Sequence, residues 1–209
     1  MIVLFLIGFV STTTAANNQG LSWGVEVGDR FNYKIFGVNN GIQDIDWDVY
    51  IQFYLVDELN ETVLSFGEMM GQSPIFSTYW SNGTLFEYYY WPVFMVFPTG
   101  NWSLVEDLYL DYISRVFTVE EVVETDSTWG YIISGNSSDT TATITAIYSK
   151  ADGVLNYYQG IRDDEISHRL REITREGYSS PGGLDPTLLL YIGIGGVLVI
   201  VAVVYVRRR

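Results

Sequence analysis

The chain has 209 residues, a formal net charge of −14 and no cysteine, and 48% of its residues are hydrophobic. The absence of cysteine excludes disulfides, thiolate catalysis and cysteine-ligated zinc. A strongly acidic surface repels phosphate groups, so we expect no nucleic-acid partner. The length suits one ordinary domain together with short targeting and anchoring segments.

A short apolar run, Ile2–Val10, lies near the start of the chain and is followed by STTTAANN. An apolar stretch that leads into small residues predicts a signal peptide over residues 1–16, with cleavage after Ala15 or Ala16. The basic residues that usually precede the apolar stretch are missing. An uncleaved anchor is the alternative, but nine apolar residues are too few to span a bilayer.

The central part of the chain shows the two-residue alternation of half-buried strands. Arg30–Val38 and Asp46–Val56 alternate apolar with polar side chains, which predicts two strands with one buried face each. Further strands are expected at Thr62–Met69, Ile75–Trp80, Thr84–Val96, Val116–Glu124, Thr128–Ser134, Thr140–Ser149 and Val154–Arg162. Asn82-Gly83 and Ala151-Asp152-Gly153 are typical of the tight turns that join such strands.

One segment, Asn101–Tyr112, has a helical pattern. Ser103 followed three residues later by Glu106 predicts a capping box at the helix start. The apolar stripe expected on this helix consists of Leu104, Val105, Leu108 and Tyr112. The sequence therefore predicts a mainly β fold, a curved antiparallel sheet or half-barrel with one packed α-helix, plus a C-terminal transmembrane helix. Glu165–Glu176 fits a helix or a last strand, and its position favours the strand.

The C-terminal part of the chain predicts a membrane anchor. Residues 179–187 have the glycine and proline content of a juxtamembrane linker. Leu188–Val206 carries no charge over nineteen residues, and as a helix it spans roughly 28 Å, close to the hydrocarbon thickness of a bilayer. The arginines at 207–209 predict a cytoplasmic tail. Residues 17–178 are then the β-rich extracellular domain, and the chain without its three terminal arginines has a formal charge of −17.

Four N-x-S/T sequons lie at expected turns or element edges, where a glycan would not disturb the core. They are Asn60, Asn82, Asn101 and Asn136. Their number favours N-glycosylation in a host that has the machinery, and the turn preference of these residue types is the alternative explanation.

Asp44, Asp46 and Asp48 repeat the spacing that opens a calcium loop. The rest of the loop is missing, because Val49 replaces the glycine and Leu55 replaces the bidentate glutamate. On a strand, the three carboxylates would lie about 6.5–7 Å apart on one face. They predict either a solvated face that discourages edge pairing or a weak Ca²⁺ site, and we expect no other cofactor.

Aromatic residues crowd between positions 79 and 97, so both faces of a strand there would carry rings. One face can be buried in the core, whereas the other requires the helix, a ligand or a partner. The candidate ligand-binding residues are Tyr79, Trp80, Phe86, Tyr88, Tyr90, Trp91 and Trp102.

His168 is the only histidine, so a Ser–His–acid site would have to use it. No G-x-S-x-G elbow surrounds a serine, and no pair of carboxylates is singled out for glycoside hydrolysis. We therefore predict no catalytic residues and no enzymatic activity.

The layout resembles that of uncharacterised archaeal-type single-pass cell-surface proteins. The features that carry the resemblance are Gly28–Ile35 (GDRFNYKI), Pro98–Ser103 (PTGNWS) and the hairpin Tyr148–Tyr158 (YSKADGVLNYY). More loosely, a curved antiparallel sheet with a helix on it is similar to the lipoprotein-carrier folds of the LolA type, which hold acyl chains. The resemblance implies a location and an architecture and transfers no functional residue.

The sequence thus predicts a single-pass protein of the cell membrane, with the N-terminal domain outside and the C-terminus in the cytoplasm. We expect the ectodomain to act as a non-enzymatic binding or structural module for a surface glycan, lipid or protein. The alternatives are a carrier that holds a hydrophobic ligand between sheet and helix, and a small carbohydrate-active enzyme.

Overall fold

The computed structural model of the protein describes residues 16–87, 94–137, 140–164 and 167–179. The expected transmembrane helix and basic tail lie outside these ranges, as do nearly all of the expected signal peptide and linker. Within the described ranges, no helix combines the length and the apolar character that a membrane span requires.

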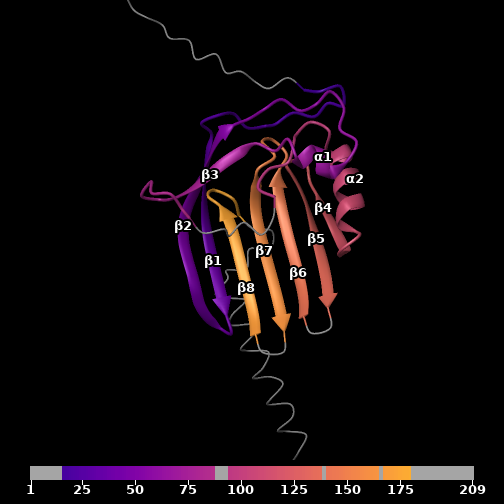
Figure 1. Cartoon of the computed structure of the whole chain (residues 1–209). Helices are drawn as coiled ribbons and strands as arrows, with labels where there is room; N and C mark the ends of the chain where they lie inside the picture. The colour runs from indigo at the N-terminus through magenta and orange to yellow at the C-terminus, as the bar shows by residue number, and fades with distance from the viewer. Residues whose placement is uncertain (1–15, 88–93, 138–139, 165–166, 180–209) are drawn as a thin grey trace, which may run out of the picture.

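The described residues form one open, antiparallel sheet (Figure 1). Its strands are β1 (Arg30–Asn39), β2 (Ile42–Leu55), β3 (Ile75–Trp80), β4 (Thr118–Glu124), β5 (Thr128–Ser137), β6 (Thr140–Ser149), β7 (Leu155–Asp164) and β8 (Ser167–Arg175). The order across the sheet is β3-β2-β1-β8-β7-β6-β5-β4, so the pairing of β1 with β8 joins the two ends of the domain. The two edge strands do not pair with each other, so the sheet does not close into a barrel. The mainly β, antiparallel prediction is confirmed.

One face of the sheet, here called the inner face, carries Tyr33, Ile35, Tyr148 and Ile173, all of which are buried. An irregular layer covers much of this face. It consists of the segment 17–29, the short helix α1 (Phe66–Met70), the chain around residues 94–100 and the helix α2 (Trp102–Ile113). In Figure 1 this layer lies over the upper part of the sheet and along the right-hand strands, and the lower ends of β6, β7 and β8 extend beyond it.

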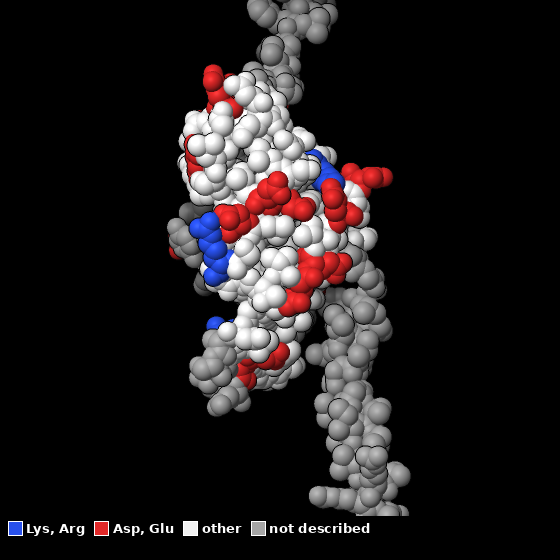
Figure 2. Space-filling model, turned by 90° about the vertical axis from the view of Figure 1, so that its right-hand side faces the viewer, with Lys and Arg blue, Asp and Glu red and all other residues white. Residues whose placement is uncertain are grey.

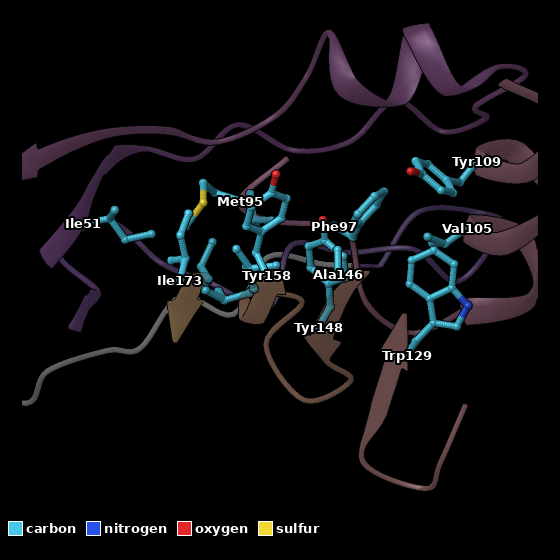
Figure 3. Packing of buried hydrophobic residues seen from close by; sticks show 14 of the residues in the cluster. Ile51, Met95, Phe97, Val105, Tyr109, Trp129, Ala146, Tyr148, Tyr158 and Ile173 are labelled. Carbon is cyan, nitrogen blue, oxygen red and sulfur yellow. The ribbon is translucent and has the colours of Figure 1, made fainter. Parts of the chain in front are cut away.

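The core between sheet and layer is rich in aromatic rings (Figure 3). Phe97 lies at its centre, with its ring centroid 4.6 Å from that of Tyr148 and 5.5 Å from that of Trp129, both in edge-on geometry. Tyr109 from α2 stacks on Tyr131 of β5 at 4.5 Å. Such pairs stabilise the core beyond the area that they bury, and they anchor α2 to β5 and β6.

The helix α2 is confirmed, but its start and its buried stripe differ from the prediction. The cap residue is Asn101, whose Oδ1 accepts a hydrogen bond from the Leu104 N–H at 3.2 Å. The predicted capping box is therefore wrong, and Glu106 instead accepts a hydrogen bond from Trp129 Nε1 at 2.9 Å. The residues that α2 buries are Val105, Tyr109 and Ile113, spaced by four, whereas Tyr112 of the predicted stripe is 44% exposed.

The prediction of a strand at Thr62–Met69 is wrong, because this region contains the helix α1. Ser65 caps the helix by accepting a hydrogen bond from the Glu68 N–H at 3.2 Å, and the Glu68 carboxylate accepts one from the Leu64 N–H at 3.0 Å. The serine–glutamate signal of a helix start thus lies in this segment. One packed helix was expected, and the described residues contain two.

The prediction of a strand at Thr84–Val96 is also wrong for the parts of this segment that the structure describes. Residues 84–87 and 94–96 form only the isolated bridges Tyr79–Leu85 and Val96–Val154. The other expected strands are confirmed, with β3 and β6 at the predicted bounds. The ambiguous segment 165–176 contains β8, so the interpretation as a strand is confirmed.

Candidate functional site

A half-open hollow of about 350 Å³ lies on the inner face at the end of the β7–β8 hairpin. We call it the arginine pocket and define it by Ala142, Ile144, Tyr158, Arg162, Arg169 and Arg171. These residues come from β6, β7 and β8, where the strands extend beyond the covering layer (Figure 1).

The register of the hairpin brings the arginines together. Arg162 of β7 lies directly opposite Arg169 of β8, and Gly160 lies opposite Arg171. Residues two apart on a strand share a face, so these positions continue the inner face from the buried Tyr158–Ile173 pair. A side chain at Gly160 would collide with Tyr158, because an added Cβ would lie 2.2 Å from the tyrosine hydroxyl. The glycine therefore leaves room for the Tyr158 ring, which lies against it in the lining of the pocket.

The three arginines differ in how their charge is compensated. Arg171 makes an ion pair with Asp44 at 2.8 Å and donates to the carbonyls of Val38 and Leu170. Arg162 is 57% exposed, and its Nε lies 4.0 Å from Asp164. Arg169 makes no ion pair with any residue that the structure describes. Arg171 is thus held in place, while the described residues leave most of the hydrogen-bonding capacity of Arg162 and Arg169 unused.

The opposite, outer face has a larger hollow of about 880 Å³, here called the polar groove. Its lining includes Lys34, Phe36, Asp46, Glu172 and Tyr178. Lys34 pairs with Asp46 at 3.1 Å, and this hydrogen bond raises the pKa of the lysine. Burial raises the pKa of the Glu172 carboxyl. Charges of both signs line the groove, so it has no clear preference for an anion or a cation.

The outline of the molecule is otherwise acidic. Figure 2 shows acidic side chains spread over the side that carries α2 and β4, with few basic ones among them. The exposed carboxylates on these two elements are Asp107, Asp111, Glu120, Glu121 and Glu124. Negative charge along the edge strand β4 discourages pairing with another chain. The arginine pocket is thus a basic site on a predominantly acidic molecule.

The three aspartates that suggested a calcium loop do not meet around a common point. A register shift after Gly37 makes Asp44 the extra residue of a β-bulge, and Asp44 pairs with Arg171 on β8. Asp46 pairs with Lys34 instead. Among the described residues, no group of three or more acidic or histidine side chains is arranged to hold a metal ion. The bulge could not be read from the alternation of residues.

The candidate aromatic residues that the structure describes are used mainly for packing. Tyr79 stacks on Tyr50 at 5.0 Å, and Phe86 is 5% exposed against Trp80 at 4.8 Å. Trp102 packs on Trp129 at 5.6 Å, far along the sheet from the other two. Tyr88, Tyr90 and Trp91 lie outside the described residues. The described rings therefore belong to separate clusters rather than to one platform.

Three of the four predicted glycosylation sites, Asn60, Asn82 and Asn136, are exposed. The fourth, Asn101, is half-buried, and its Nδ2 donates to the Gln19 carbonyl at 2.9 Å while its Oδ1 caps α2. A glycan on Asn101 would replace a hydrogen of that amide nitrogen and disturb this contact.

His168 and Ser167 are adjacent in sequence but point to opposite faces of β8. His168 contacts Asp163 on the outer face, and Ser167 donates to Asp164 at 2.7 Å. A nucleophile and its base must lie within hydrogen-bond reach of each other. Strand alternation separates these two residues, and His168 is exposed.

Reasoning from the sequence missed the arginine pocket. The interpretation of Glu165–Glu176 as a strand beside Val154–Arg162 places arginines on neighbouring strands, but the register that sets Arg162 opposite Arg169 comes from the structure. No protein-family model matches the chain, and a search of curated proteins finds no match.

Proposed function

We propose that this chain is a single-pass cell-surface protein whose residues 17–178 form a non-enzymatic binding module outside the membrane. The observation that carries the proposal is the uncharged Leu188–Val206 segment, which has the length and the apolar character of a membrane span. The described residues form a core of their own, built from side chains between Leu21 and Ile173 that are at most 9% exposed.

The direction of insertion follows from charge and from the sequons. Arg207, Arg208 and Arg209 favour a cytoplasmic C-terminus. Asn60, Asn82 and Asn136 are exposed in the domain, which is compatible with an extracellular location. The resemblance to archaeal-type surface proteins agrees with this topology and stays a prediction.

Membrane fractionation and protease shaving of intact cells test the topology. We expect full-length protein in the membrane fraction and digestion of residues 17–178 from outside. Val197→Lys together with Val201→Lys should release the protein from the membrane, because charges at the centre of a span are unfavourable. Leu64→Lys, at a position that is 78% exposed, is the control and should leave membrane retention unchanged. Soluble full-length protein, or a domain protected in intact cells, would contradict the proposal.

A carrier of hydrophobic ligands is the second candidate function. The space that such a carrier needs between the sheet and α2 is occupied by Phe97, Tyr109 and Trp129. The hollow that offers an apolar floor instead lies at the end of β6–β8 and is rimmed by arginines. This observation favours a binding module with an accessible pocket over a carrier that encloses its ligand.

A further inference from the structure

We propose that the arginine pocket binds a small organic anion, namely a carboxylate or phosphate group attached to an apolar body. The assignment deepens the proposed binding function by giving its ligand a chemical class. It rests on the arrangement of charge, on the shape of the pocket and on its apolar floor.

The first argument is the gathering of positive charge. The chain without its terminal tail contains eight basic and twenty-five acidic residues, and three of the eight line this one hollow. Arg162 and Arg169 occupy directly opposed positions on neighbouring strands. Like charges in that arrangement destabilise a sheet. A bound anion would remove the repulsion, because both guanidinium groups could donate to it.

The second argument is the uneven use of the guanidinium groups. Arg171 is committed to Asp44 and to two backbone carbonyls, so it shapes the wall of the pocket. Within the part of the chain that the structure describes, Arg169 has no ion-pair partner and Arg162 has only the distant contact with Asp164. Guanidinium forks match carboxylate and phosphate oxygens in paired hydrogen bonds. Two such forks at opposed positions form a clamp for one anionic group.

The third argument concerns the rest of the ligand. Ile144 and Tyr158 line the side of the pocket toward the core, and Ala142 lies opposite Arg162 on the neighbouring strand β6. A volume of about 350 Å³ is near the lower limit for small-molecule sites. It accommodates a small apolar body beside the anionic group rather than a folded partner.

The pocket lies at the end of the sheet where β8 begins. β8 runs from Ser167, at the pocket end, to Arg175 at the opposite end of the strand.

Calorimetric titration of the full chain in nanodiscs of zwitterionic lipid tests the assignment, with phenyl phosphate and inorganic phosphate as probes. We expect phenyl phosphate to bind at least about tenfold more tightly than inorganic phosphate, since each tenfold corresponds to about 1.4 kcal/mol of apolar contact. Arg162→Gln with Arg169→Gln should weaken phenyl phosphate binding by about tenfold or more, because charge-assisted hydrogen bonds are lost.

The matched control is Lys34→Gln with Arg115→Gln, which removes the same charge at exposed positions outside the pocket. It should leave the affinity within about twofold, because exposed charges beyond a Debye length are screened. Equal affinity for the two probes, or an equal loss in the two double variants, would overturn the assignment. Thermal unfolding of each variant without ligand checks that it is folded.

A second arm distinguishes the source of the anion. Nanodiscs that contain phosphatidic acid should lower the apparent affinity for phenyl phosphate if a lipid headgroup is the natural ligand. An unchanged affinity assigns the pocket to a free organic anion. Binding in nanodiscs does not depend on the orientation in the cell membrane, so failure of the topology and failure of the anion site are separate results.

Discussion

The inner face of the sheet has two regions that begin from the same strand alternation and end in different environments. Toward the ends of β5–β7 that lie beneath α2 and the covering layer, Trp129, Tyr148 and Leu155 are fully buried. Toward the other ends, the same face of β6–β8 carries Ala142, Arg162 and Arg169 and lies open. We call these the packed region and the arginine pocket.

The two regions differ because alternation determines the face of the sheet on which a side chain lies, whereas the covering layer determines whether that side chain is buried or exposed. Where the layer covers the sheet, large rings are stabilised by burial. Where it does not, charged side chains remain on the inner face and can meet a ligand. Substitutions in the packed region should therefore change stability, and substitutions in the arginine pocket should change binding.

The largest effect is expected for Trp129→Ala in the packed region. Trp129 is fully buried, lies among Phe97, Tyr109 and Tyr148, and donates to Glu106. The free energy of unfolding should fall by about 3–5 kcal/mol, the usual cost of removing a large buried ring. Urea unfolding followed by circular dichroism measures it.

Tyr54→Ala is the control for that prediction, because Tyr54 is 55% exposed. It should cost less than about 1 kcal/mol. Similar losses in the two variants would contradict the contrast between packed and open parts of the domain.

A smaller effect is expected for Gly153→Ala in the turn between β6 and β7. This glycine has a φ of +73°, and an added Cβ would lie 1.9 Å from the Phe97 carbonyl oxygen. The backbone must shift at the packed region, so we expect a loss of about 2 kcal/mol or more in unfolding free energy.

Gly41→Ala is the matched variant at the β1–β2 turn. Its φ is +78°, but no atom lies within 4 Å of an added Cβ. Only the left-handed backbone conformation is penalised there, by about 1–2 kcal/mol. If Gly41→Ala lowers the free energy of unfolding more than Gly153→Ala does, the contact with Phe97 is not the reason that glycine is required at position 153.

Asn101→Ala tests how the covering layer is attached. It removes the cap of α2 and the hydrogen bond to Gln19, and the cap alone is worth about 1 kcal/mol. Ser103→Ala removes the sequon without touching either contact and should change unfolding by less than about 0.5 kcal/mol. Peptide mapping should find Asn101 without a glycan; a glycan there would contradict the geometry described above.

The smallest effect, and the only one of opposite sign, is expected for Arg162→Gln in the ligand-free protein. Removing one of two directly opposed positive charges should raise the free energy of unfolding by up to about 0.5 kcal/mol. Thermal unfolding at low ionic strength measures it, because salt screens the repulsion. A loss above about 1 kcal/mol would assign Arg162 a structural role and remove the contrast with Trp129.

Much of the sheet was predictable because the signals for it are local. Alternation predicted β1 and β2, and the Asp152–Gly153 turn connected β6 to β7 as expected. The helix at 101–112 was also predicted, since its apolar spacing is a property of consecutive residues. The cap was assigned to the wrong residue because Asn101 and Ser103 both suit the position, and the contact with Gln19, eighty-two residues earlier, is not local.

The sequence by itself determined the acidic surface, the strand-rich domain and the uncharged segment near the C-terminus, because composition and periodicity express these features directly. Only the tertiary structure decided that Asp44 is the extra residue of a β-bulge and forms an ion pair with Arg171. It also decided that Arg162 faces Arg169 beyond the edge of the covering layer. Both outcomes depend on register and on which part of a face is covered, and these are set by contacts between residues far apart in the chain.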